Sequence, residues 1–237
     1  MQKLILPIFF LFTTILGSFA RDNVEAILDS LDQTIGQKQQ FEKQKEKEIE
    51  LLKQWLQESS SFREVFDLSS RLSKAYEKYQ IDSAIVYAEE ALKCARKLNL
   101  SENIYQTNFQ LVTLYSSTGM FREAEVILES TDKDEVPNDL LSRYFEAYRL
   151  FFNYYAANVR TNDYLNKTRA YRDSLMQVLK PETRSYRIHQ AEALIEEGRT
   201  DKAKEQLLEI LKATAPEDSD YALITFLIGL AEEADGR

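Results

Sequence analysis

The chain has 237 residues, with 30 Lys and Arg against 39 Asp and Glu, and a formal net charge of -9. This charge argues against nucleic acid as a partner of this segment, because phosphate binding requires clustered cations. Glycine and proline are scarce, at 6 and 4 residues, and the alternating pattern of strands is absent, so the sequence predicts an all-α fold.

The first 20 residues have the pattern of a secretory signal peptide. Lys3 is a short positive region, residues 4–16 are apolar, and Ser18 and Ala20 are small residues at the positions that a signal peptidase reads. We therefore predict export and cleavage after Ala20. The alternative is an uncleaved anchor, although the run is shorter than the roughly 20 apolar residues that span a bilayer. The longest later apolar run, 222–231, is also too short, so we expect no transmembrane span after the signal peptide.

Residues 21–58 are predicted to form one long helix before the repeats. Leu28, Leu31 and Ile35 recur at steps of three and four, and Ile49 and Leu52 resume the same phase. The segment between these two groups is almost entirely polar. Two interpretations stay open, a helix that caps the first repeat and a coiled-coil seam that makes a homodimer.

A glycine, an alanine five residues later and a leucine four residues beyond it occur together twice. The two sets are Gly119, Ala124 and Leu128, and Gly198, Ala203 and Leu207. This spacing is typical of the tetratricopeptide repeat, in which the glycine closes the turn between two helices and the alanine lies where they come closest. The sequence therefore predicts a tetratricopeptide-like α-solenoid of antiparallel helix hairpins.

The repeats have recognisable boundaries. Serines at 59–61 provide a cap for the first repeat's first helix, and Asp82 is expected to cap its second helix. Pro137, Pro181 and Pro216 each fall at a boundary, where a proline disfavours helix at the preceding residue. We expect repeats at about 59–100, 101–136, 137–180 and 181–216, followed by a half-repeat at 217–237.

Three segments carry a resemblance to a known family, namely Leu28–Ile35, Lys45–Lys53 and Ala170–Leu175. With them the chain resembles the exported part of tetratricopeptide-containing, single-pass membrane transcriptional regulators of Gram-negative anaerobes. In that family, further repeats lead to a transmembrane helix, a cytoplasmic coiled coil and a helix-turn-helix domain. The resemblance implies that the chain is the periplasmic sensor portion of such a protein.

Catalysis finds little support in the sequence. His189 is the only histidine, which excludes a metal site built on histidines and makes a catalytic triad depend on one residue that we interpret as structural or surface. No phosphate-binding glycine loop or nucleophile elbow occurs. Cys94, the only cysteine, lies at helical spacing from Ala91 and Ala95 and is predicted to be a small buried residue. We expect no enzyme activity, cofactor or metal.

Recognition on a concave surface is the function that stacked hairpins favour. A register projected from the repeat alanines places ten first-helix residues on that surface: Phe66, Ser69, Ser73, Tyr76, Gln106, Phe109, Thr113, Ser116, Tyr148 and Tyr155. Aromatic rings there would grip a protein or peptide partner, or stack on the sugar rings of an oligosaccharide. The alternative is that most of these aromatic side chains are core, because repeat helices bury both flanks.

Two functions follow from this interpretation. The first is the sensor segment of a membrane-anchored transcriptional regulator, and the second is a free-standing periplasmic scaffold of an envelope or nutrient-uptake complex. The gene sequence downstream of Arg237 would discriminate between them.

Overall fold

The computed structural model of the chain describes residues 38–159, 162–216 and 218–234. Regular structure in these ranges is entirely helical, without any strand, which confirms the predicted all-α class. The predicted signal peptide at 1–20 and the beginning of the long N-terminal helix, at 21–37, lie outside the described residues. Among the helices that are described, none combines the length and apolarity needed to span a bilayer.

The chain divides into two units, residues 1–58 and 59–237. The described helix of the first unit is α2 (Lys38–Glu58), whose surface is mostly charged. Lys45 and Glu48 form an ion pair of 2.9 Å one turn apart. Pairs of this kind stabilise a polar helix by about 0.2–0.5 kcal/mol each. Whether α2 caps the repeats or pairs with a second copy stays a prediction.

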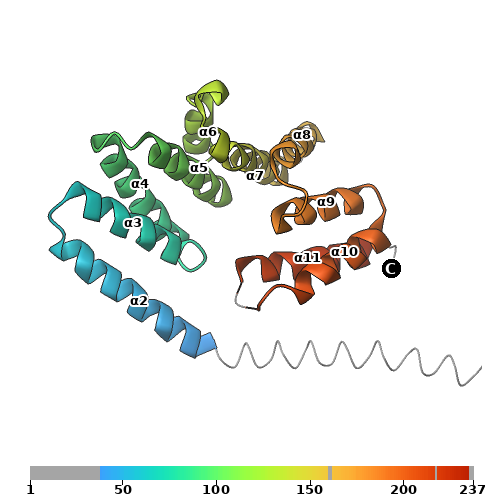
Figure 1. Cartoon of the computed structure of the whole chain (residues 1–237), viewed down its shortest axis with the longest axis horizontal. Helices are drawn as coiled ribbons and strands as arrows, with labels where there is room; N and C mark the ends of the chain where they lie inside the picture. Colours follow the sequence, from blue (N-terminus) through green and yellow to red (C-terminus); the bar gives the residue numbers. More distant parts are fainter. Residues whose placement is uncertain (1–37, 160–161, 217, 235–237) are drawn as a thin grey trace, which may run out of the picture. The chain divides into compact units, whose positions relative to one another are not determined.

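The second unit is a series of helices that pack neighbour on neighbour, and α5 also packs on α7 (Figure 1). Its elements are α3 (Phe62–Tyr76), α4 (Ile81–Lys97), α5 (Ser101–Thr118), α6 (Phe121–Glu129), the short 3-10 turns η1 (Lys133–Glu135) and η2 (Asn138–Leu140), α7 (Leu141–Val159), α8 (Asn162–Val178), α9 (Arg184–Glu196), α10 (Thr200–Lys212) and α11 (Ser219–Ala234). Helices α3, α5, α7 and α9 are the first helices of four hairpins, and α4, α6, α8 and α10 are their partners. This is the predicted tetratricopeptide-like solenoid.

Glycines lie in two of the hairpin turns. Gly119 and Gly198 adopt φ values of 81° and 74°, which side chains with a Cβ atom rarely adopt. Just beyond each glycine, a backbone N–H reaches back to the helix that is ending. Met120 donates to the Tyr115 carbonyl and Arg199 donates to the Leu194 carbonyl, each over 2.8 Å. These bonds satisfy carbonyl groups that the end of a helix leaves free.

The repeat alanines lie where paired helices are in closest contact. Ala84, Ala124 and Ala203 are each 0% exposed. The Ser73 hydroxyl of α3 donates to the Ala84 carbonyl of α4 over 2.9 Å, so little space remains between the two backbones. A larger side chain at these positions would force the helices apart. Their full burial agrees with the predicted role of the repeat alanines, which stays a prediction for Ala124 and Ala203.

The predicted caps of the first hairpin have different outcomes. The Ser61 hydroxyl accepts the Glu64 N–H over 3.2 Å, as expected for the cap of α3. The prediction for Asp82 is wrong, because α4 begins at Ile81 and its cap position is Gln80. Asp82 instead lies in the first turn, where a carboxylate interacts favourably with the helix dipole.

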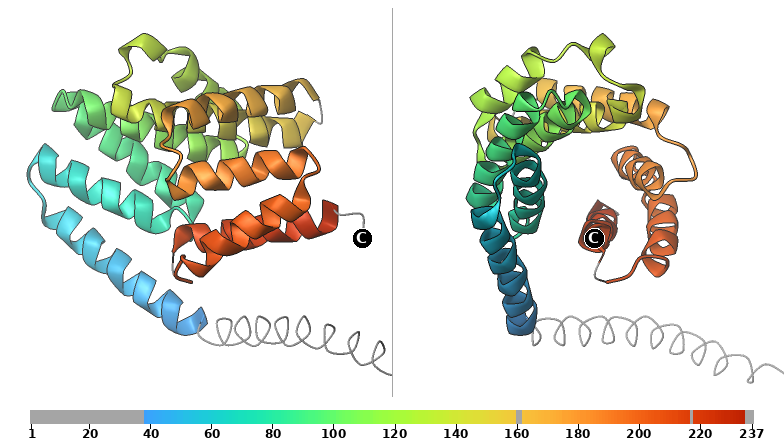
Figure 2. Two further views of the ribbon diagram at one scale, coloured as in Figure 1. Left: turned by 45° about the vertical axis from the view of Figure 1, so that its right-hand side comes forward. Right: turned by 60° about the vertical axis from the view of Figure 1, so that its left-hand side comes forward.

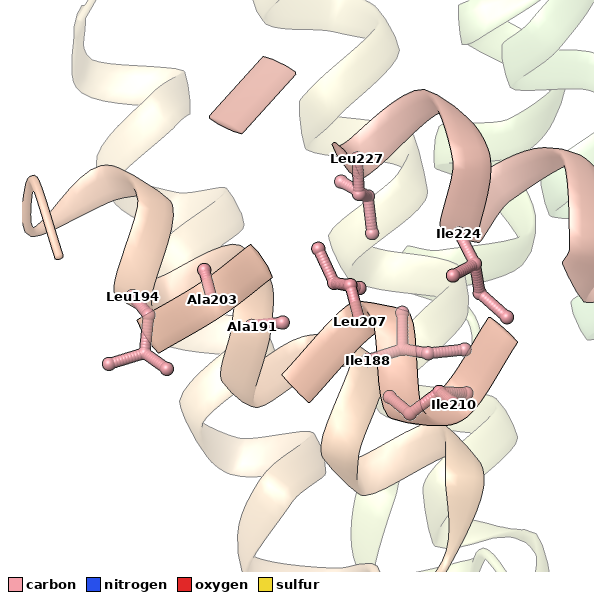
Figure 3. Packing of buried hydrophobic residues seen from close by; sticks show 8 residues of the cluster. All are labelled: Ile188, Ala191, Leu194, Ala203, Leu207, Ile210, Ile224 and Leu227. Atoms are coloured by element: carbon pink, nitrogen blue, oxygen red, sulfur yellow. The ribbon is translucent and has the colours of Figure 1, made fainter. Parts of the chain in front are cut away.

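The last helices of the described chain share one apolar core. Figures 2 and 3 show α9, α10 and α11 side by side around it. Its buried side chains are Ile188, Ala191, Leu194, Ala203, Leu207, Ile210, Ile224 and Leu227. Burying one Leu or Ile side chain contributes about 1.5–3 kcal/mol.

Cys94 lies in the core between α3 and α4 and is 1% exposed. Burial, together with the nearby Glu90, raises the pKa of its thiol. This confirms the interpretation of Cys94 as a small buried residue.

Candidate functional site

A groove of about 810 Å³ crosses the first helices of the second unit. It receives side chains from α3, α5, α7 and α9, together with the end of α8. A volume in this range is typical of ligand sites in proteins. The groove therefore follows the surface on which helical repeats usually recognise partners.

The middle of the groove, on α5, is polar and uncharged. Asn103, Gln106, Gln110 and Thr113 line it at helical spacing. The Gln110 side-chain amide donates to the Ser73 hydroxyl over 3.0 Å, which fixes its orientation. The Asn103 side chain makes no hydrogen bond to any described residue, so its amide is available to a ligand. Each such amide offers both donors and an acceptor.

Charged side chains of both signs flank this row of amides. Lys74 of α3 and Glu77, directly after the end of α3, line the groove, and Arg143 and Glu146 line it one turn apart on α7. Lys74 and Arg143 are exposed. Neither sign dominates, so the groove favours a ligand that carries both charges.

Two phenylalanines form the apolar part of the lining. Phe66 is 6% exposed and Phe109 is 3% exposed, so only a small part of each ring reaches the groove. The Phe109 ring packs against Tyr105 of α5 and Tyr144 of α7, with centroid distances of 6.2 and 5.9 Å. Contacts between α5 and α7 hold this part of the lining in place.

A half-buried ionic network fixes the α7–α9 end of the groove. The Arg149 guanidinium donates two hydrogen bonds to Glu146, of 2.7 and 2.8 Å, and its third nitrogen lies 3.8 Å from Glu192. Bidentate pairs of this kind are the stronger ion pairs. On α9, His189 Nδ1 lies 2.9 Å from the Glu192 carboxylate. The network joins α7 to α9 directly behind the groove lining.

Two pKa values reflect this network. Burial alone would raise the pKa of Glu192, but the hydrogen bond to His189 and the charge of Arg149 outweigh it, and the pKa lies below its ordinary value. Burial alone would lower the pKa of Arg149, but Glu146 raises it above the ordinary value. Both groups are therefore held in their charged forms. His189, which is 6% exposed, has the structural role that the sequence predicts.

A comparison with protein-family models matches residues 35–237 to the SusR N-terminal TPR domain, where TPR stands for tetratricopeptide repeat. The chain belongs to this family. The match confirms both the predicted fold and the family resemblance. A comparison with curated proteins finds no match. A SusR-type TPR domain is a helical-repeat module for protein interaction, and the fold is typically non-catalytic.

Four of the ten residues expected on the concave surface of this TPR domain line the groove. They are Phe66, Gln106, Phe109 and Thr113. Gln106 donates to Glu102 on its own helix over 2.9 Å, and the Thr113 hydroxyl donates to the Phe109 carbonyl over 3.2 Å. That these residues bind a partner stays a prediction.

Four other expected residues lie in the packing between helices. Ser69 and Ser73 are 0% exposed and face the helices that α3 contacts. Tyr76 is 5% exposed and its ring stacks on Tyr87 of α4 at 5.7 Å. Ser116 is 1% exposed and donates to the Val112 carbonyl over 2.6 Å. Small or flat side chains at these positions allow the helices to approach closely.

The last two expected residues, Tyr148 and Tyr155, belong to the aromatic packing of α7. The Tyr148 ring stacks on Tyr171 of α8 at 4.6 Å, and its hydroxyl donates to the Leu128 carbonyl over 2.9 Å. The Tyr155 ring meets Tyr164 of α8 edge-on at 4.7 Å. Neither side chain lines the groove.

Several groove residues of the TPR domain do not appear in the sequence-based expectation. On α3 the lining continues through Ser70 and Lys74, each one position after a buried serine. One residue is a rotation of about 100° around a helix. The sequence holds one signal that points to Lys74. A small residue such as Ser73 is typical of the helix face that packs on another helix, and a charged residue directly after it is typical of the neighbouring exposed face. Within the described ranges, no cluster of side chains is suited to hold a metal ion.

Proposed function

We propose that the chain is the periplasmic sensor segment of a membrane-anchored transcriptional regulator and that its groove recognises an extended protein segment. The observation that carries the recognition step is the uncharged amide row of α5 between charged side chains of α3 and α7. The family membership supports the assignment to a regulator of the SusR type. Export rests on the sequence pattern of the first 20 residues.

A peptide chain fits the chemistry of this groove. Side-chain amides such as those of Asn103 and Gln106 pair with the alternating N–H and C=O groups of an extended backbone. Lys74 and Arg143 would pair with acidic side chains of the partner, while Glu77 would pair with basic ones. A neutral oligosaccharide would use the amides and the aromatic rings but would leave these charges without partners. The charged flanks therefore favour a protein segment over a sugar.

Peptide selection on the purified chain tests the groove. Peptides from a random display library that bind the wild type are measured by calorimetry against Asn103→Ala, Arg143→Glu and the control Lys202→Glu, an exposed change on α10. We expect the two groove variants to weaken binding about five- to fiftyfold, a loss of about 1–2.3 kcal/mol. Lys202→Glu should bind as the wild type does. Enrichment of no peptide, together with binding of a neutral oligosaccharide, would contradict the peptide proposal.

The reading frame of the gene after Arg237 tests the sensor role separately. A transmembrane helix followed by a helix-turn-helix domain would support a membrane regulator. A stop codon would support the second function, a free-standing scaffold for an envelope or nutrient-uptake complex, which the same groove would serve.

A further inference from the structure

A second groove, of about 680 Å³, lies between α4 and α6. Its lining comes from α4 and α6 on the two sides and from α5, through Leu111 and Tyr115, between them. It shares no lining residue with the groove described above. We call it the outer groove, because the second helices of the hairpins form its walls.

Apolar side chains line the inside of the outer groove. Leu92 and Leu111 are buried at 8% and 1% exposure, and both contribute to the lining. Val126, on the α6 wall, is 49% exposed. Ile127 lies beside it and is half-buried. The described residues leave about half of the Val126 side chain in this apolar strip uncovered.

Positive charge surrounds the apolar strip. The cationic lining residues are Lys93, Arg96, Lys97 and Arg122, against the carboxylates Glu89 and Glu123. This excess of cations stands out on a chain of net charge -9 and contrasts with the balanced charges of the first groove. A partner with negative charge is favoured here.

Lys97 lies over the Phe62 ring, with its Nζ 4.2 Å from the ring centroid, and the other three cations remain available to a partner. Lys93 pairs with Glu90 at 3.1 Å and Arg122 pairs with Glu125 at 2.9 Å, but both pairs are exposed, and such pairs exchange partners at little cost. The Arg96 side chain makes no hydrogen bond or ion pair with any described residue. In contrast, Glu89 is already engaged, because it accepts a 2.6 Å hydrogen bond from the Tyr115 hydroxyl.

We propose that the outer groove binds an acidic amphipathic helix of a partner protein. The apolar face of that helix would lie on Leu111 and Val126, and its carboxylates would pair with Arg96 and its cationic neighbours. A groove walled by two helices is the usual receptor for a third helix. A lipid surface fits less well, because Leu92 and Leu111 are recessed between α4 and α6 and a flat bilayer would reach only Val126. The proposal is independent of the first groove and of the sensor role.

Two synthetic helical peptides test the proposal. Both carry the same leucine face, and one is flanked by Glu while the other is flanked by Lys. We expect the Glu peptide to bind the wild-type chain at least about tenfold more tightly than the Lys peptide, and to lose affinity as salt rises. Arg96→Glu should weaken the Glu peptide about three- to tenfold and Val126→Asp should weaken it at least as much. The control Lys202→Glu should bind as the wild type does.

Melting temperatures show whether the variants remain folded, which we expect because Arg96 and Val126 are exposed. Equal binding of the two peptides, or undiminished binding to Arg96→Glu, would overturn the proposal. Sedimentation of the chain with vesicles of anionic phospholipid, blocked by Arg96→Glu, would overturn it in favour of a membrane surface. None of these outcomes depends on what the first groove binds.

Discussion

The Phe109 side chain both lines the groove and packs between helices. The ring is 3% exposed and contacts Tyr105 and Tyr144, yet a small part of it also reaches the groove. Where the fold is a single layer of hairpins, few helix positions belong only to the core or only to the surface. Residues that shape the binding surface therefore also contribute to the free energy of unfolding.

Replacing Phe109 with Ala should destabilise the second unit severely. The change removes a buried ring and both aromatic contacts, and truncation of a buried Phe typically costs about 3–5 kcal/mol. Chemical denaturation of Phe109→Ala against the wild type measures the loss. As a matched comparison, Phe226→Ala removes a ring that is 61% exposed and should change stability by less than about 1 kcal/mol. A small loss at Phe109 would mean that the ring packs loosely and serves mainly the groove.

Glu192 links stability to pH at the α7–α9 end of the groove. Its pKa is lowered, with the hydrogen bond to His189 and the charge of Arg149 outweighing the effect of burial. The ordinary pKa of an unfolded Glu is about 4.3. Above that pH the contribution of Glu192 to the free energy of unfolding is complete, and it is lost as pH falls through the lower folded pKa.

Glu192→Gln should therefore reduce stability at pH 7 and have a smaller effect at pH 3. The neutral amide keeps the shape of the side chain but loses the charge that faces Arg149, and we expect a loss of about 1–3 kcal/mol at pH 7. Urea denaturation of both proteins at several pH values isolates this difference. Glu205→Gln, at an exposed position on α10, is the control and should leave the curve unchanged. A difference that is constant from pH 7 to pH 3 would refute the linkage.

Three of the four hairpins, as elements, have a fully buried alanine in their second helix. Ala124 and Ala203 are 0% exposed, and Ala84 accepts a hydrogen bond through its carbonyl from the opposite helix. The turns before two of these alanines use glycine at positive φ. The first hairpin has no such glycine, and its turn instead closes through the N–H of Gln80, which donates to the Tyr76 carbonyl over 2.8 Å.

Ala124→Leu and Ala203→Leu should each destabilise the fold, by about 1–3 kcal/mol from overpacking of a close helix contact. Glu205→Leu introduces the same side chain at an exposed position of α10 and should change stability by no more than about 0.5 kcal/mol. Thermal melts of the three variants compare the effects. If all three melt together, the alanines do not mark the helix contacts.

The turns, boundaries and helix faces differ in how well the local sequence predicts them. Glycine turns and proline boundaries were predictable, because their chemistry is local to a few residues. Which face of α3 meets the groove was not, because the rotation of a helix about its axis is set by packing against α4 and α5. Ser73 shows this, since its hydroxyl donates to α4 and accepts from Gln110 of α5. The inward turn of Tyr148 has the same cause, a stacking partner on α8 that is distant in sequence.

At the scale of the whole molecule, two surfaces of different character lie on one series of helices. The first groove has balanced charges and a row of amides, and the outer groove has an apolar strip among cations. Neighbour-on-neighbour packing makes this separation possible, because the first groove is lined mainly by first helices, whereas α4 and α6, the second helices of the first two hairpins, line the outer groove together with one side of α5. The two proposals therefore place two partners on separate residues of the chain.

Export of the chain is predicted from the sequence pattern of its first 20 residues, and cleavage of these residues is the prediction that tests it. Signal peptidase requires small side chains at positions such as Ser18 and Ala20. Protein recovered from the periplasm should have an intact mass that corresponds to a chain beginning at Arg21. Ala20→Tyr should block cleavage and leave the precursor in the membrane fraction, because a large ring does not fit the peptidase. The second-unit variant Glu205→Gln should be processed normally. A periplasmic species that retains Met1 would show that the N-terminal segment is not removed and would favour the anchored alternative.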